Sequence, residues 1–568
     1  MKTNLFLLLA LCIPSLQLLA DPGHHPPFEP TGTPCREITT TPNNYGVRLI
    51  PVSLRQRFNR DSLSGISDAP QSITLQGWRG ETVQAQILVE SPQGFTHLSA
   101  FTDTPSVISD VKLIRYTTGN SVLVPDIVDK IPNHPLPGVV RPLLLTYKIP
   151  SYRTTDTLRD TLHVYVNGEH LQLPITINIA PVTLPVAKDW SFHLDLWQHP
   201  DTVARWHDVP MWSDLHLALL YPQMRYLANM GQKTITCTLI EEAWQEQTHD
   251  YFRSMIKVFK KPDGTWQYDT TAFDKWVTFA KNTVGMTNAT INCYTLIPWS
   301  LTFPYTDLAT QTIQKPKLVP GTPEYEDFWG PYLTFFVNHL KEKGWLADTR
   351  IAMDERPDHL LIPALEIVQR YAPELKIVAA CDHPSAINRN FEDVSYAYDH
   401  CESLIAELPE RKAQGKTTTF YTCLYPYRPN TLMYSELAEA EWLIPMAAHY
   451  ELDGMLRWAF HSWEANPFLS MDHVRFPSGD TALMYPGNRP SLRLTAIRNG
   501  IETFEKIHLL KAESARQNRP EVLEPLTQAL SKFTVARGKE ASIHETDLIQ
   551  LDQALIQVTN ALYSSATH

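Results

Sequence analysis

The spacing of apolar residues changes near residue 184, and this change constrains the fold of the 568-residue chain more than any other feature. Before it, apolar and polar residues alternate in short runs, as in residues 82–89, and turn sequences such as Asn167-Gly168 separate the runs. Period-two alternation with frequent turns is typical of antiparallel strands. We therefore predict an antiparallel β-sandwich domain over residues 47–184.

After residue 184, short apolar runs alternate with stretches of helical spacing. The helical stretches cover residues 214–230, 271–283, 324–343, 359–371 and 435–450. The candidate strands are residues 192–196, 234–239, 289–294, 351–353, 377–381, 394–398, 417–423 and 454–458. Strands that alternate with helices in this number fit a (β/α)8 barrel of the TIM type. We predict this barrel over residues 185–490.

The last part of the chain is helical in composition. Residues 491–510, 521–535 and 545–562 have a heptad-like spacing of apolar side chains. Such a spacing gives each helix one apolar face, which must be buried against a neighbour. We expect residues 491–568 to form a helical extension that packs on the barrel, so the chain as a whole is predicted to be multidomain.

The first twenty residues have the features of a secretory signal peptide. Lys2 precedes an apolar run at residues 5–11, and small or polar residues surround Ala20. We expect cleavage before Asp21, a linker over residues 21–46, and a protein that is exported to the periplasm or secreted. Leu11 is a poor residue before a lipidated cysteine, which argues against a lipid anchor at Cys12. No later apolar run reaches the roughly 20 residues that a transmembrane helix needs.

Composition narrows the possible partners. The formal net charge is −12, which argues against nucleic acid as a partner. The cysteines after Cys12 form no CxxC pair, and most lie in apolar runs, so we expect buried small side chains; a bridge between Cys237 and Cys293 stays open. The histidines form no HExxH motif, and no metal site is predicted.

Asp354 and Glu355 are the strongest catalytic candidates. An apolar run at residues 351–353 ends in these two acids, and Pro357 stops the strand from continuing. On spacing alone a solvated turn is the simpler interpretation. However, barrel enzymes build their active sites at the carboxyl ends of strands. Neighbouring carboxylates also differ in pKa, because ionising one disfavours ionising the other, and acid/base catalysis uses such a difference.

Aromatic residues follow several of the other expected strands. These are Trp197, Trp299, Tyr425, Trp458 and Trp463. Each ring alone is more simply explained by core packing, but several at one rim are typical of a carbohydrate cleft, because aromatic faces stack on the C–H faces of sugars. We count them, with Tyr294, Arg457 and Asp480, as candidate substrate contacts. For Arg457 and Asp480 a buried ion pair is an equal alternative, and Tyr294 contacts the substrate or packs in the core.

The adjacency of the two acids suggests a particular mechanism. Two-carboxylate glycosidases usually place the second carboxylate across the scissile bond, about 5 Å or more from the first. Sequence neighbours cannot easily do so, and the strand at residues 417–423 is followed by no acid before Glu436. A 2-acetamido sugar can instead supply its own attacking amide oxygen. Glu355 would then act as acid and base, while Asp354 orients the amide and stabilises the oxazolinium-like intermediate. For both to face one substrate, Glu355 must lie beyond the end of the strand.

Longer motifs resemble a known family. The motifs are residues 78–81, 195–200, 452–463, 476–487 and 491–502, which read WRGE, DLWQHP, LDGMLRWAFHSW, FPSGDTALMYPG and SLRLTAIRNGIE. In order and content they look like glycoside hydrolase family 123, over nearly the whole mature chain. The resemblance implies an exo-acting β-N-acetylgalactosaminidase with substrate assistance, its acid pair at Asp354 and Glu355, and no metal or organic cofactor. His461 stands where the family pattern has Asn. It alters specificity if that Asn contacts the sugar, but we favour the interpretation that it is a supporting residue behind the substrate contacts.

The sequence therefore predicts an exported retaining glycosidase that removes terminal β-linked N-acetylgalactosamine from a glycan or glycoconjugate. Two alternatives stay open. One is a non-catalytic glycan-binding protein on the same scaffold. The other is a hydrolase of a different sugar, with a conventional nucleophile elsewhere in the chain.

Overall fold

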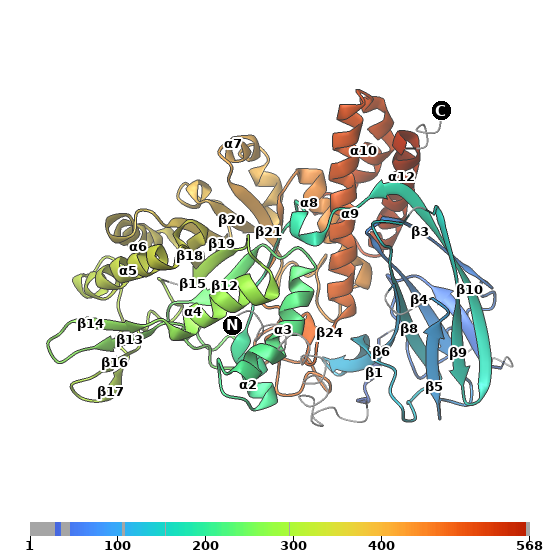
Figure 1. Cartoon of the computed structure of the whole chain (residues 1–568), viewed down its shortest axis with the longest axis horizontal. Helices are drawn as coiled ribbons and strands as arrows, with labels where there is room; N and C mark the ends of the chain where they lie inside the picture. The colour runs from blue at the N-terminus through green and yellow to red at the C-terminus, as the bar shows by residue number, and fades with distance from the viewer. Residues whose placement is uncertain (1–28, 36–45, 105–107, 154, 295, 564–568) are drawn as a thin grey trace, which may run out of the picture.

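The computed structural model describes residues 29–35, 46–104, 108–153, 155–294 and 296–563. The expected signal peptide at residues 1–20, with Cys12, and most of the expected linker lie outside these ranges. Figure 1 shows a strand-rich N-terminal part on the right, a barrel on the left and the C-terminal helices between them. In the described part of the chain, no helix combines the length and the apolar character that crossing a membrane requires.

Two sheets make up the N-terminal part. One has the strand order β1-β7-β6-β8-β4-β2 and the other β3-β10-β9-β5. The strands are β1 (Thr33–Pro34), β2 (Arg48–Val52), β3 (Ile73–Arg79), β4 (Thr82–Glu90), β5 (Leu98–Thr102), β6 (Ser109–Gly119), β7 (Val122–Asp129), β8 (Val140–Lys148), β9 (Thr157–Val166) and β10 (Glu169–Thr183). Alternate residues of both sheets, such as Ile87, Leu143, Val164 and Ile177, form one buried core. The period-two alternation of the sequence follows from this one-sided burial.

The expected antiparallel pairing holds for most neighbouring strands but not for all. β3 runs parallel to β10, and β1 runs parallel to β7. Alternation reveals which residues face the core, but it carries no information on the direction of the neighbouring strand, so this part of the prediction was wrong. β9 and β10 form the expected hairpin, with Asn167 at φ 52° and Gly168 at φ 95°. Both values suit the turn that matches strand twist in a two-residue hairpin.

Eight parallel strands form the central barrel, and each overlaps a strand predicted from the sequence. They are β11 (His193–Leu196), β12 (Thr234–Thr238), β15 (Thr290–Tyr294), β18 (Thr349–Asp354), β19 (Lys376–Cys381), β20 (Asp393–Ala397), β21 (Thr417–Tyr421) and β22 (Gly454–Arg457). In space they follow the chain order. The first two strands meet only through a bridge between Leu194 and Gln232, so the barrel is nearly closed.

Helices surround the barrel in every interval but one. They are α2 (Pro200–His207), α3 (Asp214–Ala228), α4 (Thr271–Thr278), α5 (Pro323–Lys343), α6 (Asp358–Tyr371), α7 (Leu408–Ala413) and α8 (Leu437–Tyr450). The link from β19 to β20 contains only the 3-10 turn η4 (Asn388–Asn390). This link spans residues 382–392, which is shorter than the dozen residues that a helical crossover needs. The strict (β/α)8 pattern is therefore interrupted here.

Two hairpins that the sequence analysis did not predict extend the barrel loops. β13 (Lys257–Lys260) and β14 (Trp266–Asp269) follow β12, and β16 (Tyr305–Asp307) and β17 (Thr312–Gln314) follow β15. The four strands form one sheet that projects from the lower left of Figure 1. The sequence Pro262-Asp-Gly-Thr265 between β13 and β14 is a turn signal that could have revealed the first hairpin.

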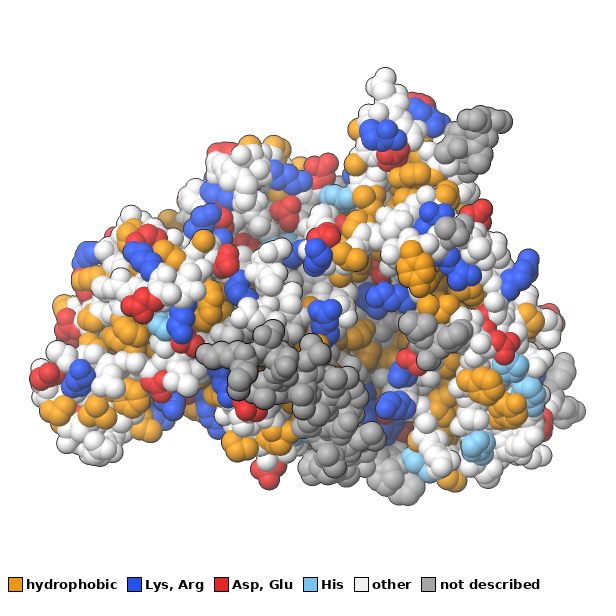
Figure 2. Space-filling model, viewed as in Figure 1, with side chains coloured by type: hydrophobic (Ala, Val, Ile, Leu, Met, Phe, Trp, Pro, Cys, Tyr) orange, Lys and Arg blue, Asp and Glu red, His pale blue; other side chains and the backbone are white. Residues whose placement is uncertain are grey.

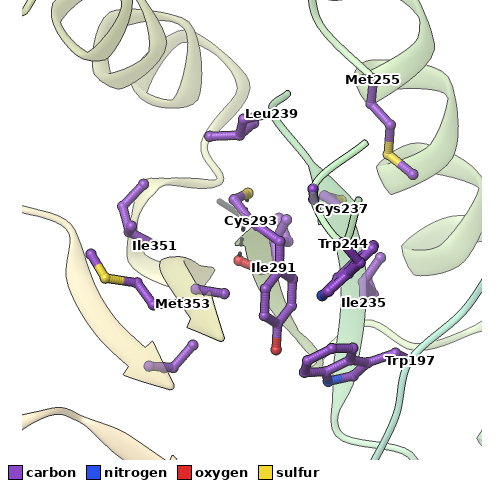
Figure 3. Close-up of a cluster of buried hydrophobic side chains, with 14 of the residues drawn as sticks. Trp197, Ile235, Cys237, Leu239, Trp244, Met255, Ile291, Cys293, Ile351 and Met353 are labelled. Atoms are coloured by element: carbon purple, nitrogen blue, oxygen red, sulfur yellow. Dashed lines mark hydrogen bonds between the residues drawn. The ribbon is translucent and has the colours of Figure 1, made fainter. Parts of the chain in front are cut away.

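The barrel core carries aromatic residues at the carboxyl ends of its strands, where Trp197 follows β11 and Tyr294 ends β15. Figure 3 shows Trp197 and Trp244 beside Ile235 and Ile291, which come from the neighbouring strands β12 and β15. Cys237 and Cys293 are paired in register on these two strands, and both thiols are free. The buried cysteines therefore act as small apolar side chains, as expected.

The C-terminal helices join the barrel to the N-terminal sheets. Ser491 caps the N-terminus of α9 (Leu492–Arg516), where its hydroxyl accepts a hydrogen bond from the Leu494 amide. α9 shares a buried cluster with α8. The expected helix at residues 521–535 is divided into η6 (Pro520–Leu523), α10 (Glu524–Leu530) and α11 (Val535–Gly538), and α12 (His544–Tyr563) follows.

An ion pair with both side chains buried connects the N-terminal sheets to α9. The Arg493 guanidinium on α9 lies 2.9 Å from the carboxylate of Asp126 on β7. Arg493 also donates to the carbonyls of Thr431, Gly479 and Ala482 in the barrel loops. One side chain thus ties three segments of the chain together.

Candidate active site

Asp354 is the last residue of β18, and Glu355 is the first residue beyond it. Glu355 has φ 30°, and its amide donates to the Ala380 carbonyl at 2.9 Å. The backbone therefore leaves the regular strand at Glu355, as expected for two neighbouring acids that serve one site. A positive φ in a residue other than glycine is strained, and such strain is common at functional sites.

The Asp354 carboxylate is held from the β15 side of the barrel mouth. Trp299, in the loop after β15, donates its indole N–H to Asp354 at 2.8 Å. The Arg356 guanidinium lies 3.4 Å from the centre of the Trp299 ring and donates to the Asp354 backbone carbonyl. Burial and then the charge of Glu355 raise the pKa of Asp354 to about 7, against the opposing effect of the Trp299 hydrogen bond.

The Glu355 carboxylate is held from the opposite side of the mouth. The hydroxyl of Tyr421, the last residue of β21, donates to it. Burial raises the pKa of Glu355, the Tyr421 hydrogen bond lowers it, and the charge of Asp382 raises it again. Asp382 follows β19 and lines the same small cavity as Glu355. Sequence analysis did not select Tyr421, because only the closed barrel shows that the end of β21 faces Glu355.

Two acids whose pKa values are both raised retain a proton between them into the neutral pH range. Each raised value favours the neutral carboxyl form, and ionising one acid opposes ionising the other. The hydrogen-bond donors differ: an indole N–H stabilises the Asp354 carboxylate, and a phenol O–H reaches Glu355. The pair therefore provides a proton donor and an anion at one site, which is what general acid catalysis beside a developing cation needs.

Two of the predicted contacts form the floor of the barrel mouth. Trp197 and Tyr294 are each 1% exposed, with ring centres 4.5 Å apart, and Trp244 packs against both. Burial raises the pKa of Tyr294, and the charges of Asp195 and Asp354 raise it further. The Tyr294 phenol is therefore neutral and lies within electrostatic reach of Asp354.

Arg457 and Asp480 form a fully buried ion pair. Arg457 donates to the Asp480 carboxylate at 2.8 Å and to the Thr422 carbonyl at 2.6 Å. Trp458 is partly buried and donates its indole N–H to the other Asp480 oxygen at 3.1 Å. Of the two interpretations left open, the structure supports the ion pair, and its effect is to orient Trp458 and the loops around it.

The remaining two predicted contacts differ in exposure. Trp463 is fully buried, packs against Trp206 and donates to the Met484 carbonyl at 2.6 Å, so neither face of its indole is open to solvent. Tyr425 lies in the loop after β21 and is 69% exposed. Trp463 therefore supports the wall of the site, whereas Tyr425 is free to contact a ligand.

His461 is buried behind the aromatic residues. Its ring packs against His199 and Trp463, and burial lowers its pKa well below the usual value, so the imidazole is neutral. This is the supporting position expected for the residue that replaces Asn in the family pattern. Among the described residues, no group of three or more His, Cys, Asp or Glu side chains is arranged to hold a metal ion.

The sequence profile described as glycoside hydrolase 123, catalytic domain, matches residues 197–510, which is more than half of the chain. The chain belongs to glycoside hydrolase family 123. The matched region contains the acid pair, its two hydrogen-bond donors and the Arg457–Asp480 pair. The expected resemblance is confirmed, and the protein is a glycoside hydrolase.

A solved structure of a family 123 glycoside hydrolase from Clostridium perfringens has the same fold. It is 19% identical, covers 92% of this chain and 100% of its own, and superimposes with a TM-score of 0.82. The work on that enzyme concerns glycolipid glycan hydrolysis. The match to the β-glucuronidase 3 of Bacteroides uniformis covers 82% of this chain and 52% of that enzyme at 10% identity, but with a TM-score of 0.28 the two structures do not superimpose as one fold. A search of curated protein sequences found no significant match to this chain.

Proposed function

We propose that this protein is an exported exo-acting glycosidase that releases terminal β-linked N-acetylgalactosamine with retention of configuration. Export rests on the signal-like sequence at residues 1–20. The observation that carries the proposed mechanism is the arrangement of the two acids. Asp354 and Glu355 are adjacent, but Trp299 and Tyr421 hold them from different sides of the barrel mouth.

In the first step the substrate's own acetamide oxygen attacks the anomeric carbon, and the bond to the leaving oxygen breaks. Glu355 gives its proton to that oxygen, so the leaving group departs as an alcohol. The intermediate is a positively charged oxazolinium ion. Asp354 is suited to bind the amide N–H and to balance this charge, because the Trp299 N–H holds its carboxylate in place.

In the second step Glu355, now ionised, takes a proton from water, and the resulting hydroxide attacks the anomeric carbon. The ring of the intermediate opens, the acetamide is restored, and the two inversions give net retention. Glu355 regains its proton and Asp354 ends as it began. The raised pKa of Glu355 suits this double role, because a carboxyl with an elevated pKa keeps its proton more readily as the acid and is a stronger base once ionised.

Asp382 favours a second candidate function, a glycosidase with a conventional carboxylate nucleophile and no need of a 2-acetamido group. It lies at the end of the neighbouring strand β19, lines the cavity beside Glu355 and is exposed. In such an enzyme Asp382 would attack the anomeric carbon and Glu355 would protonate the leaving group.

A panel of aryl β-glycosides that differ at C2 and C4 tests the two functions. Substrate assistance requires hydrolysis of the 2-acetamido sugars, inhibition by a thiazoline mimic of the intermediate, and loss of activity when the acetamide is replaced by hydroxyl. Rapid cleavage of the 2-hydroxy glycosides, abolished by Asp382→Asn, would support the second function instead. The C4 epimers report the preference for galacto or gluco sugars.

A further inference from the structure

The loop between β21 and α8 presents three tyrosines to solvent. Tyr425, Tyr427 and Tyr434 are 69%, 65% and 39% exposed. Only six Phe, Tyr or Trp side chains of the described residues are exposed, and three of them lie in this one short loop, so their clustering requires an explanation. Clustered exposed aromatic side chains are typical of a ligand or partner surface.

The loop that carries these rings is held in one conformation. The buried Asn430 side chain donates to the carbonyls of Cys423 at 2.9 Å and of Pro426 at 2.7 Å. Glu439 on α8 accepts from the Asn430 amide and from the Arg428 guanidinium. A rigid loop loses little conformational freedom when a ligand binds, so its contacts contribute more to affinity.

Two of the rings also support each other. Tyr427 and Tyr434 are stacked, with ring centres 4.9 Å apart and planes 17° apart. One face of each ring is thus covered by its neighbour, while Tyr427 as a whole stays 65% exposed. Tyr434 therefore fixes the orientation in which Tyr427 meets a ligand.

The position of the loop relative to the two acids identifies what it would bind. The loop begins directly after Tyr421, whose hydroxyl donates to Glu355. Glu355 protonates the leaving oxygen, so the leaving group must lie on the Glu355 side of the scissile bond. The terminal sugar and its acetamide lie on the other side, where Trp299 holds Asp354. The loop that carries the tyrosines follows the carboxyl end of β21, at the same end of the barrel as Glu355.

We propose that Tyr425, Tyr427 and Tyr434 form a binding site for the leaving group, and that its ligand is the sugar ring next to the released residue. The inference rests on the proposed function, because it takes Glu355 as the acid. Aromatic faces suit the C–H faces of a sugar ring, and phenol hydroxyls at their edges suit its hydroxyl groups. The enzyme is then adapted to oligosaccharide substrates, and the loop adds no binding energy for substrates that lack a second sugar ring.

The test compares two substrates of the whole enzyme that share the terminal sugar. One is a disaccharide, and the other is the glycosyl fluoride, whose leaving group has no ring. Tyr427→Ala should lower kcat/KM for the disaccharide roughly tenfold, the loss that truncating a well-packed aromatic contact often causes. The same variant should hydrolyse the fluoride at the wild-type rate. Tyr427→Phe, which keeps the ring face, should retain most of the disaccharide activity.

Tyr152, in the N-terminal part, is 84% exposed and provides a matched control, since Tyr152→Ala should leave both substrates unaffected. Equal losses on both substrates, or none on either, would overturn the leaving-group site. A loss as large on an alkyl glycoside as on the disaccharide would overturn its assignment to a sugar. Failure of the proposed function is recognised separately, because the wild-type enzyme would then hydrolyse neither the disaccharide nor the fluoride of N-acetylgalactosamine. In that case the comparison is repeated with the terminal sugar that the enzyme does accept.

Discussion

The indole N–H of Trp299 donates a hydrogen bond to the Asp354 carboxylate at 2.8 Å, from a loop that follows a different strand of the barrel. This contact fixes one oxygen of Asp354 and favours its ionised form, against burial and the charge of Glu355, which together raise its pKa to about 7. The Arg356 guanidinium covers the ring face and holds the indole in place. The indole thus acts on the charge and on the orientation of Asp354 at once.

Trp299→Phe should reduce kcat and move the acidic limb of the pH–rate profile to higher pH. The variant keeps a ring but loses the donor, and a hydrogen bond to a charged group contributes about 1.5–3 kcal/mol, or roughly 10- to 100-fold in rate. The sign follows because the lost bond lowered the pKa of Asp354, so its removal lets Asp354 take up a proton at higher pH. Steady-state kinetics across the pH range measure both effects.

Trp266→Phe is the matched control for this experiment. Trp266, on β14 of the projecting sheet, donates its indole N–H to the Asp327 carbonyl on α5 at 3.1 Å, away from the acid pair. Its replacement also removes one indole hydrogen bond, but the pH–rate profile should not change. An identical shift in both variants would argue against a direct effect of Trp299 on Asp354.

Glu355→Gln and Asp354→Asn should fail in different ways. Glu355→Gln removes the proton donor, so the loss should be largest for poor leaving groups and small for an activated aryl glycoside, which departs without protonation. Asp354→Asn removes the charge that balances the intermediate, so its loss should be similar for all leaving groups. A plot of log kcat/KM against leaving-group pKa distinguishes the two, and parallel lines for the two variants would refute the separate roles.

Activity should fall as the pH rises through the pKa of Glu355, because the acid must carry its proton. Tyr421 donates to the Glu355 carboxylate and so lowers this pKa. In Tyr421→Phe the pKa should rise, and the basic limb of the kcat/KM profile should move to higher pH even though the maximal rate is lower. A profile from about pH 4 to 9 covers both limbs. A basic limb that stays in place in Tyr421→Phe would assign the acid to another group.

Asp480→Asn should destabilise the protein markedly. It leaves Arg457 buried without its counter-charge, and breaking a buried pair in this way costs about 3–5 kcal/mol. Glu451→Gln breaks the exposed pair with Lys412 and should change the free energy of unfolding by no more than about 1 kcal/mol. Urea unfolding of the two variants makes the comparison. Similar small losses of unfolding free energy in both variants would mean that water solvates the Arg457 guanidinium in place of Asp480.

The sequence was sufficient to locate the barrel strands and the acid pair. Each strand is a short apolar run between polar loops, so the pattern alone shows which residues are buried. Asp354 and Glu355 stand out because apolar residues lead directly into two charges at a strand end. The role of Tyr421 was not predictable, because it depends on the closure that brings β21 to face β18.

Two kinds of information were missing from local patterns. The direction of β3 relative to β10 depends on how the chain crosses between the sheets, and alternation does not encode it. The burial of Trp463 also depends on partners far away in sequence, such as Met484. A tryptophan after a barrel strand has the same local signature whether it faces a ligand or the core.

The Asp126–Arg493 pair has a consequence for any attempt to divide this protein. Asp126 belongs to the N-terminal sheets, yet Arg493 also donates to the carbonyl of Thr431, in the loop between β21 and α8, and to those of Gly479 and Ala482, beside Asp480. Removing the sheets would leave the Arg493 guanidinium without the Asp126 carboxylate and would loosen the loops that border the catalytic mouth. The N-terminal sheets thus stabilise the loops around the catalytic mouth. We expect the sheets and the barrel to have been inherited together, and to be exchangeable between relatives only together.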